Sequence, residues 1–346
     1  MKNDKKLRIG INGFGRIGSV ALRAVLLEKY DVEVVAINTK GDMPIEAFVM
    51  QFKYDSVYGR LPFKIEAGEA QKGSEIGRLN IGEGISIPFL GESDPGKIAW
   101  KNYGVEVVLE CSGAFTDARA ADHLKGGVKK VVISAPAKDP KIPLFILGVN
   151  EDRYQGEAVV SNGSCTTNCV APIVKLLDEK IGFQTGVLTT IHAYTTNQNI
   201  VDGPGKDPRR SRAAAINIVP TSTGAAEAVV RSYPEVKGRF FGTAIRVPVV
   251  CGSYSDMTFK MVRRITQEEI NNLFMEASVQ PELVGKMKVS YDPLVSSDII
   301  GNNASCVIDS RMTDVLADDT LIIGAWYDNE YGYSCRLVEM ALFIGK

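Results

Sequence analysis

Histidine is scarce in this sequence, with only His123 and His192 in 346 residues. Long apolar runs are also absent, because none approaches the ~20 residues that a membrane-spanning helix requires. The charged N-terminus leads directly into a strand-like segment, without the apolar core of a secretory signal. We therefore expect a cytoplasmic protein with no membrane role.

An excess of one charge sign is missing too. Lys and Arg number 40 and Asp and Glu 41, which gives a net charge of −1 and argues against a dedicated nucleic-acid site. The six cysteines are scattered, and the close pair Cys165 and Cys169 has neither a second pair nor a histidine at zinc-ligand spacing. We expect no disulfide framework and no metal site.

The first segments have the order of a dinucleotide-binding unit. An apolar strand is expected at 7–12, a helix at 19–28 and a second strand at 32–37. Between the first strand and the helix lie Gly13, Gly15 and Gly18 in the G-x-G-x-x-G spacing, with Arg16 and Ile17 inside it. Glycines at this spacing allow a tight turn and a close approach to a pyrophosphate at a helix N-terminus. The alternative, a plain glycine turn, does not explain the flanking strand and helix.

Two later apolar runs, at 105–110 and 128–134, extend this into a parallel sheet, with a helical segment at 117–124 between them. Ligands of such sheets bind beyond the carboxyl ends of the strands. Ser112, Gly113 and the turn at 134–136 are therefore candidates for lining a cofactor, although ordinary loop chemistry also explains them. With a chain long enough for two domains, the sequence predicts an α/β fold with an N-terminal Rossmann domain.

The residues after the second strand bear on the choice of cofactor. Proteins that prefer NAD normally carry an acidic residue here, which binds the adenosine ribose. This sequence has Thr39 and Lys40 instead, so no carboxylate repels a 2′-phosphate and a lysine could pair with it. We expect NADP to be accepted beside NAD, or preferred. Alternatively, Asp42 or a backbone carbonyl binds the ribose and Lys40 is a solvated surface residue.

A cysteine lies where a thiolate would be stabilised. The segment S-N-G-S-C-T-T-N-C runs from a strand into a helical segment at 170–180, which places Cys165 at or just before the helix start. Helix N-termini favour anions and lower the pKa of a thiol. Cys165 is therefore a candidate nucleophile, with a small buried hydrophobe as the alternative, whereas Cys169 is expected to be packed and inert.

A nucleophilic cysteine needs a base, and His192 is the obvious partner. It ends a β-branched run at 187–191, where a strand could direct it at a pocket. On its own, a histidine at a strand end is more often structural. His123 lies in a helical stretch and is expected at the surface.

The motifs N-G-F-G-R-I-G, S-A-P-A-K-D, S-N-G-S-C-T-T-N-C, T-I-H-A-Y-T, R-A-A-A-I-N-I-V-P-T-S-T-G-A-A, R-V-P and W-Y-D-N-E-Y-G-Y occur in this order along the chain. Together they resemble phosphorylating glyceraldehyde-3-phosphate dehydrogenase over essentially its whole length. The resemblance implies a nucleotide domain at 1–164, an α+β catalytic domain with a mixed sheet at 165–328, and a C-terminal helix at 329–346 that packs back on the nucleotide domain. It also implies a homotetramer.

The resemblance further implies the reaction. Cys165 would add to the aldehyde of glyceraldehyde 3-phosphate, hydride would pass to NAD or NADP, and inorganic phosphate would cleave the resulting thioester to 1,3-bisphosphoglycerate. His192 would raise the thiolate character of the cysteine and manage the proton. The remaining implied site residues are, for the cofactor, Gly13, Gly15, Arg16, Ile17, Gly18, Thr39, Lys40, Ser93, Ser134 and Asn329; for the substrate phosphate, Thr195 and Arg246; and for the attacking phosphate, Ser164, Thr166, Arg210, Thr223 and Gly224.

Three positions depart from the family's common pattern, and a fourth keeps it. Thr39 replaces an acidic residue, Ser93 replaces a basic residue near the adenine, and Asn197 stands where an acidic or hydroxyl residue is frequent. Pro204 remains where NADP-using plastid relatives often carry serine, which weakens the case for NADP.

Other functions fit parts of the sequence. An erythrose-4-phosphate dehydrogenase would keep the cysteine and histidine but usually differs after His192 and around the attacking-phosphate site. A non-phosphorylating dehydrogenase would not need Arg210 and Thr223 together. A binding role beside catalysis, toward RNA or a surface receptor, stays open, and the basic segment at 206–212 has a nucleic-acid patch as its alternative explanation.

Overall fold

The computed structural model describes residues 5–346, which form two compact units. The N-terminal unit runs to Phe145 and includes Tyr154–Gly163 and Ser334–Lys346, and the second unit comprises Ile146–Arg153 and Ser164–Tyr333. Among residues 5–346, no helix is both long enough and apolar enough to cross a membrane.

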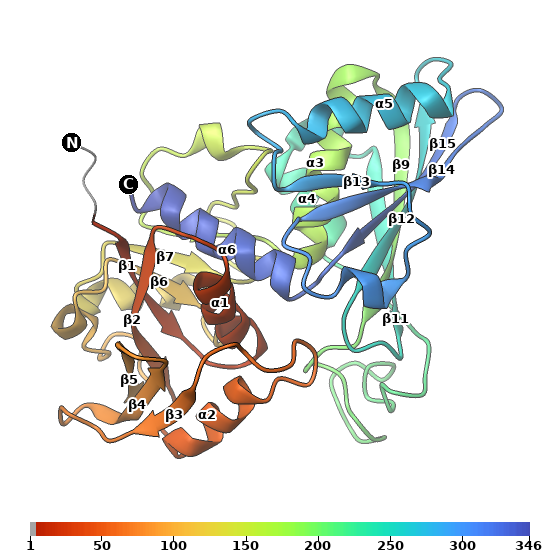
Figure 1. Cartoon of the computed structure of the whole chain (residues 1–346). Helices are drawn as coiled ribbons and strands as arrows, with labels where there is room; N and C mark the ends of the chain where they lie inside the picture. Colours follow the sequence, from red (N-terminus) through yellow and green to blue (C-terminus); the bar gives the residue numbers. More distant parts are fainter. Residues whose placement is uncertain (1–4) are drawn as a thin grey trace. The chain divides into compact units, whose positions relative to one another are not determined.

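The N-terminal unit is built on an eight-stranded sheet in the order β3-β4-β5-β2-β1-β6-β7-β8. The strands from β5 to β8 in that order are parallel, and β3 and β4 add an antiparallel edge. Figure 1 shows β1, β2, β6 and β7 side by side. The strands are β1 (Leu7–Asn12), β2 (Val32–Thr39), β3 (Ile65–Gly68), β4 (Glu75–Ile81), β5 (Ile85–Gly91), β6 (Val107–Glu110), β7 (Lys130–Ile133) and β8 (Val159–Ser161).

Burial along these strands explains the parallel arrangement. Every residue of β6 is buried, as are the last four of β1. A parallel strand reads as a continuous apolar run because both of its faces are covered. The covering elements are α1 (Arg16–Leu27), α2 (Ile45–Lys53), and the 3₁₀ helices η1 (Trp100–Tyr103) and η2 (Ala118–Gly126).

The element boundaries differ locally from the sequence-based ones. Helix α1 begins at Arg16 rather than at residue 19, because Gly15 directly follows the turn and serves as its N-cap. The expected strands at 105 and 128 begin two residues later, at Val107 and Lys130. The helix expected at 117–124 is the 3₁₀ helix η2, and the Asp117 side chain caps it by accepting from Arg119 N.

The second unit contains a seven-stranded mixed sheet in the order β10-β11-β9-β12-β15-β14-β13. Strand β9 pairs parallel with β11 and antiparallel with β12. The α/β class and the mixed second sheet predicted from the sequence are confirmed. The strands are β9 (Phe183–Ala193), β10 (Val219–Thr221), β11 (Phe240–Val247), β12 (Ser253–Met261), β13 (Met287–Ser290), β14 (Cys306–Leu316) and β15 (Thr320–Tyr327).

Helices cover only part of this sheet. Alternate residues of β12 are buried and the others are exposed or half-buried, which is the pattern of a strand with one packed face. Large apolar side chains remain exposed on β9, β11 and β14, at Val187, Phe241 and Met312. The helices are α3 (Cys165–Lys180), α4 (Ala225–Ser232), α5 (Gln267–Ser278) and the short η3 (Glu151–Arg153), η4 (Pro234–Val236) and η5 (Ser296–Ile299), and α6 (Tyr331–Ile344) follows β15.

Candidate active site

Cys165 is the first residue of α3, as the sequence predicted. The Ser164 side chain caps the helix by accepting a hydrogen bond from Thr167 N at 3.1 Å. The buried Cys169 lies one turn further along, and its Sγ faces Ser255 Oγ at 3.8 Å. The predicted difference between a cysteine at the helix start and a packed one is therefore confirmed.

The thiol of Cys165 faces a histidine. Its Sγ lies 3.4 Å from Nε2 of His192, near the end of β9. His192 is 4% exposed. This is hydrogen-bonding distance for sulfur and places a titratable nitrogen beside the candidate nucleophile.

The other ring nitrogen of His192 has two neighbours. Nδ1 lies 2.8 Å from Arg246 Nη1 and 2.7 Å from the carbonyl oxygen of Ala193. Arg246 stands opposite His192 in the β9–β11 register, and its Nη1 also contacts Ala193 O at 2.8 Å and Thr195 Oγ1 at 3.4 Å.

These contacts bear on the tautomer of His192. A guanidinium can only donate, so a bond from Arg246 to Nδ1 places the ring proton on Nε2, facing the sulfur. A bond from Nδ1–H to the Ala193 carbonyl instead leaves Nε2 free to accept a proton. Both partners of Nδ1 are in place, so the site has the contacts for either form.

Burial dominates the titration of the pair. It raises the pKa of the Cys165 thiol, while the charge of Arg246 and hydrogen bonds from Thr166 act in the opposite direction. Burial and then the charge of Arg246 lower the pKa of His192 to about 3, so this imidazole is neutral near pH 7. The expected net lowering of the cysteine pKa by the helix N-terminus is wrong, because desolvation outweighs it.

Tyr327 closes the buried side of the site. Its hydroxyl bonds to Thr166 Oγ1 at 2.9 Å and to Thr190 Oγ1 at 2.8 Å, and its ring packs edge-on to His192. It thereby ties the first turn of α3 to β9. Tyr327 lies in the motif W-Y-D-N-E-Y-G-Y, but the sequence alone indicated no role for its side chain.

Two arginines make the surroundings positive. The charge of Arg210 also lowers the pKa of both His192 and Arg246, so the three groups share one local field. Within residues 5–346, Nε of Arg246 is buried and has no hydrogen-bond partner. Two mutually repelling cations with a spare buried donor are suited to binding an anion.

Arg210 is held by the segment that precedes α4. Its Nε donates to Thr221 Oγ1 at 3.0 Å and its Nη2 to Ser222 O at 3.1 Å. Thr223 and Gly224 follow directly, and Gly224 is the N-cap of α4 without a capping side chain. Thr223 Oγ1 accepts from Ala225 N at 3.1 Å, so one N–H group of the first turn is satisfied within the chain. Arg210 and the remaining N–H groups of this helix N-terminus lie close together, which is a suitable arrangement for phosphate.

In the N-terminal unit, the glycines of the turn between β1 and α1 differ in how much space surrounds them. Gly13 has φ +90°, and a Cβ there would lie 2.6 Å from the backbone of Ser112. A Cβ on Gly18 would lie 2.0 Å from Gly13 O, so this glycine lets α1 pack against the turn. A Cβ on Gly15 would meet nothing within 4 Å, which leaves open space at the N-terminus of α1.

The neighbouring cofactor candidates occupy the same edge of the sheet. The Arg16 side chain forms an ion pair with Asp55 at 2.7 Å. The backbone N–H groups of Arg16 and Ile17 lie in the first turn of α1. Thr39 is buried and its Oγ1 accepts from Gly41 N at 3.3 Å, whereas Lys40 and Ser93 are exposed.

Two further cofactor candidates lie at strand ends. Ser134 follows β7 and its N–H donates to Glu110 O at 3.0 Å. Asn329 is 4% exposed, and its Oδ1 accepts from Gly252 N at 3.2 Å and from Ser253 Oγ at 2.9 Å. With its oxygen occupied in this way, the amide Nδ2 of Asn329 is the group left to donate.

Comparison with known proteins gives two family matches. Residues 7–118 match the glyceraldehyde 3-phosphate dehydrogenase NAD binding domain, and residues 164–329 match the C-terminal domain of the same enzyme. The chain belongs to the glyceraldehyde-3-phosphate dehydrogenase family. It is 46% identical over 343 residues to glyceraldehyde-3-phosphate dehydrogenase of Streptomyces coelicolor, covering 98% of this chain and 99% of the relative. The corresponding protein of Mycobacterium bovis is 45% identical over 346 residues, with the same coverage.

The family membership confirms the resemblance seen in the motifs, and with it an NAD-binding oxidoreductase. The family membership does not by itself assign a functional role to any side chain. The structure joins Cys165, His192, Arg246 and Thr195 by direct contacts. The hydroxyls of Ser164 and Thr166 have protein partners, in Thr167 and Tyr327.

The basic segment at 206–212 is engaged locally. Arg212 pairs with Asp202 at 2.8 Å, and Arg209 Nη1 donates to Pro220 O at 3.3 Å. These contacts, like those of Arg210, tie the basic side chains of the segment to groups of the same chain. Among residues 5–346, no group of three or more His, Cys, Asp or Glu side chains could hold a metal ion.

The expectation for His123 is wrong. Its side chain is fully buried, with Nε2 2.8 Å from Glu110 Oε2 and Nδ1 3.1 Å from Trp100 Nε1. The helical segment around it reads as polar, but η2 turns this residue inward, where a buried carboxylate at the end of β6 needs a donor.

Proposed function

We propose that the chain oxidises glyceraldehyde 3-phosphate to 1,3-bisphosphoglycerate, with Cys165 as nucleophile, a nicotinamide cofactor as hydride acceptor and inorganic phosphate as acyl acceptor. The observation that carries this is the 3.4 Å contact of Cys165 Sγ with His192 Nε2, beside an arginine with a spare buried donor. The family match supports the same reaction.

Side chains of this chain account for the protons in each covalent step. His192 Nε2 takes the proton of the Cys165 thiol as the sulfur adds to the aldehyde carbon, and returns it to the carbonyl oxygen, which gives a thiohemiacetal. His192 Nε2 takes the proton of its hydroxyl as hydride leaves the same carbon, which yields a thioester. A phosphate oxygen then attacks the thioester carbonyl, the C–S bond breaks, and the thiolate is regenerated.

Two anion sites follow from the neighbouring residues. Arg246 and Thr195 would hold the phosphate of the substrate, because Arg246 Nε is buried without a partner and Nη1 reaches Thr195. Arg210, Thr223 and Gly224, with Ser164 and Thr166, would hold the attacking phosphate. Arginine supplies charge-assisted bonds, and the N-terminus of α4 adds backbone donors.

The glycine turn fits a dinucleotide, since the space at Gly15 is open and α1 has no capping side chain. Gly13, Gly15, Gly18 and the backbone of Arg16 and Ile17 would bind the pyrophosphate, with Ser134 nearby. Bound nicotinamide would supply the hydride acceptor, and Asn329 Nδ2 would donate to its carboxamide.

We also propose that NADP is accepted. Thr39 brings no carboxylate to the end of β2, and the neighbouring Lys40 is exposed and could pair with a 2′-phosphate. Comparing kcat/KM for NAD and NADP tests this, and a tenfold or greater preference for NAD would overturn it. Thr39→Asp should lower kcat/KM for NADP by about tenfold or more while leaving NAD nearly unaffected.

The nucleophile has a matched control. Cys165→Ser should lose turnover by about three orders of magnitude or more while still binding cofactor, because an alcohol is far less ionised than a thiol. Cys169→Ala should keep turnover within a few-fold. Equal NAD(P)H formation without phosphate or arsenate would refute the phosphorylating reaction and favour hydrolysis or an erythrose-4-phosphate dehydrogenase.

A cytoplasmic homotetramer is proposed as the form in which this enzyme works. The exposed apolar side chains of the second unit include Ile200, Val201, Ile216 and Ile218, each at least 71% exposed. Ala214 N donates to Asn199 O at 2.9 Å, so the two stretches that carry these residues lie close together. Large exposed apolar patches mark protein interfaces. Light scattering should give four chains per particle, and a monomer at micromolar concentration would contradict it.

A further inference from the structure

Glu110 is a buried carboxylate at the carboxyl end of β6, with 1% of its surface exposed. It accepts four hydrogen bonds. Oε1 accepts from the backbone N–H and the hydroxyl of Ser112 at 2.8 and 2.5 Å, and Oε2 accepts from Asn12 Nδ2 at 2.5 Å and His123 Nε2 at 2.8 Å. A buried carboxylate is stable only when its lone pairs are satisfied in this way.

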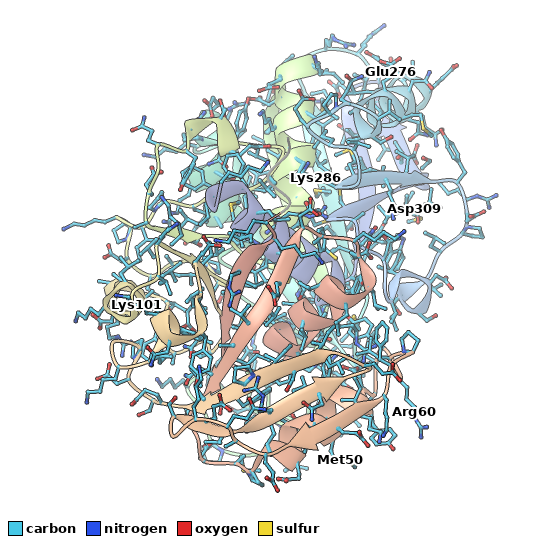
Figure 2. All side chains as sticks on the ribbon, turned by 60° about the vertical axis from the view of Figure 1, so that its left-hand side comes forward. Met50, Arg60, Lys101, Glu276, Lys286 and Asp309 are labelled. Carbon is cyan, nitrogen blue, oxygen red and sulfur yellow. The ribbon has the colours of Figure 1, made fainter. Side chains whose placement is uncertain are left out.

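His123 supplies the donor from outside the sheet. Trp100 Nε1 can only donate, so its 3.1 Å bond to Nδ1 fixes the ring proton of His123 on Nε2, facing Glu110. Trp100 is fully buried, although its neighbour Lys101 in η1 is exposed (Figure 2). The indole therefore sets the tautomer that the carboxylate needs.

The partners of Glu110 belong to the turns where a dinucleotide binds. Asn12 directly precedes Gly13, and its Oδ1 accepts from Asn38 Nδ2 at 2.7 Å, next to Thr39. Ser112 is exposed in the turn after β6, and its Oγ accepts from Ala114 N at 3.1 Å. The backbone of Ser112 lies against Gly13, where a Cβ would be only 2.6 Å away.

We propose that the buried pair of His123 and Glu110 positions the Ser112 turn against the Gly13 turn, and so sets the affinity for the nicotinamide dinucleotide. This rests on the proposed function only in taking that edge of the sheet as the cofactor site. His123 and Glu110 are positioning residues, since both are buried and act through Ser112 and Asn12. Neither takes part in the chemistry at Cys165.

The test separates binding from turnover and from stability. His123→Leu fills the same space without a donor and leaves Oε2 of Glu110 short of one partner. Its Kd for NAD, measured by titration without substrate, should rise about tenfold or more, since a lost charge-assisted hydrogen bond is worth about this much. At saturating NAD, kcat and the KM for glyceraldehyde 3-phosphate should stay within about twofold.

Two further variants make the result specific. His123→Gln places an amide N–H near the position of Nε2 and should restore the Kd to within about threefold of the original chain. Val108→Ala opens a cavity in the same strand β6, in the apolar cluster that also contains Trp100, but removes no hydrogen bond of the network. It serves as a control for lost stability. Its Tm should fall while its Kd for NAD changes less than twofold.

The measured Kd and kcat values distinguish a failure of the positioning role from a failure of the proposed reaction. If His123→Leu binds NAD as the original chain does, or no more weakly than Val108→Ala, the positioning role is wrong. If the unmodified chain binds NAD but shows no turnover with glyceraldehyde 3-phosphate and phosphate, the proposed reaction fails and the positioning role still stands on its Kd. Equal losses in Kd and kcat for His123→Leu and His123→Gln would mean a general structural role.

Discussion

Arg246 contacts the histidine that faces Cys165, with Nη1 2.8 Å from Nδ1 of His192. One cation thus acts on both members of the pair: its charge lowers the pKa of His192 and also lowers that of the Cys165 thiol against the larger effect of burial. The two effects have the same direction but different consequences. The neutral histidine is kept neutral, and the half-buried thiol of Cys165 is shifted toward its thiolate form.

The reactivity of Cys165 should therefore depend on Arg246. In Arg246→Gln, the thiol loses the charge that opposes its burial, so its pKa rises further and alkylation by iodoacetamide at pH 7 should slow by about three- to tenfold. The full pH profile of the alkylation rate should shift to higher pH. Arg210→Gln is the matched control, because Arg210 is not among the groups that chiefly set the pKa of this thiol, and an equal shift in both variants would contradict the assignment.

The low pKa of His192, about 3 in the folded chain, makes a prediction about stability. An unfolded histidine titrates near 6.5, so between these values the unfolded chain binds a proton that the folded chain does not. Stability is therefore fully present above about pH 6.5 and falls as the pH drops toward 3. Between pH 7 and 4 the unmodified chain should lose about 2 to 3 kcal/mol more than His192→Gln.

Urea unfolding of both chains at several pH values checks this. The other ionisable groups are the same in both proteins, so their contribution cancels in the difference. Parallel stability curves would show that the pKa of His192 in the folded chain lies close to its value in the unfolded chain, and would contradict the prediction.

The sequence was sufficient where a local pattern has one physical solution. Glycines at 13, 15 and 18 after an apolar strand specify a turn into a helix, and Cys165 after S-N-G-S specifies a helix start. Three features depended on tertiary burial instead. The inward direction of His123, the bridging hydroxyl of Tyr327 and the net pKa of Cys165 each follow from residues distant in the sequence, with separations such as the 161 positions between Thr166 and Tyr327.

Alanine substitutions at the glycines of the turn should impair the protein in different ways, through its stability or through its binding of NAD. At Gly18 an added Cβ would meet Gly13 O at 2.0 Å, so Gly18→Ala should lower the Tm clearly and weaken NAD binding as well. At Gly15 the space is open and φ is −82°, so Gly15→Ala should fold with a Tm close to the original. Its Kd for NAD should still rise by about tenfold or more, because the methyl group would stand where the pyrophosphate approaches. A Gly15→Ala chain with unchanged Kd would place the dinucleotide elsewhere.

The orientation of the Asn329 amide can be tested with two serine variants of strand β12. Ser253 Oγ donates to Asn329 Oδ1 at 2.9 Å and accepts from Ala193 N at 3.1 Å, so it fixes which end of the amide is free. Ser253→Ala removes one of the two donors to that oxygen and should raise the KM for NAD about fivefold, the cost of one buried hydrogen bond. Ser255→Ala is its matched control, since Ser255 lies two residues along β12, is equally buried and faces Cys169 instead. If both alanine variants raise the KM alike, the effect belongs to the packing of β12, whereas an effect confined to Ser253 shows that the serine presents Nδ2 of Asn329 to the cofactor.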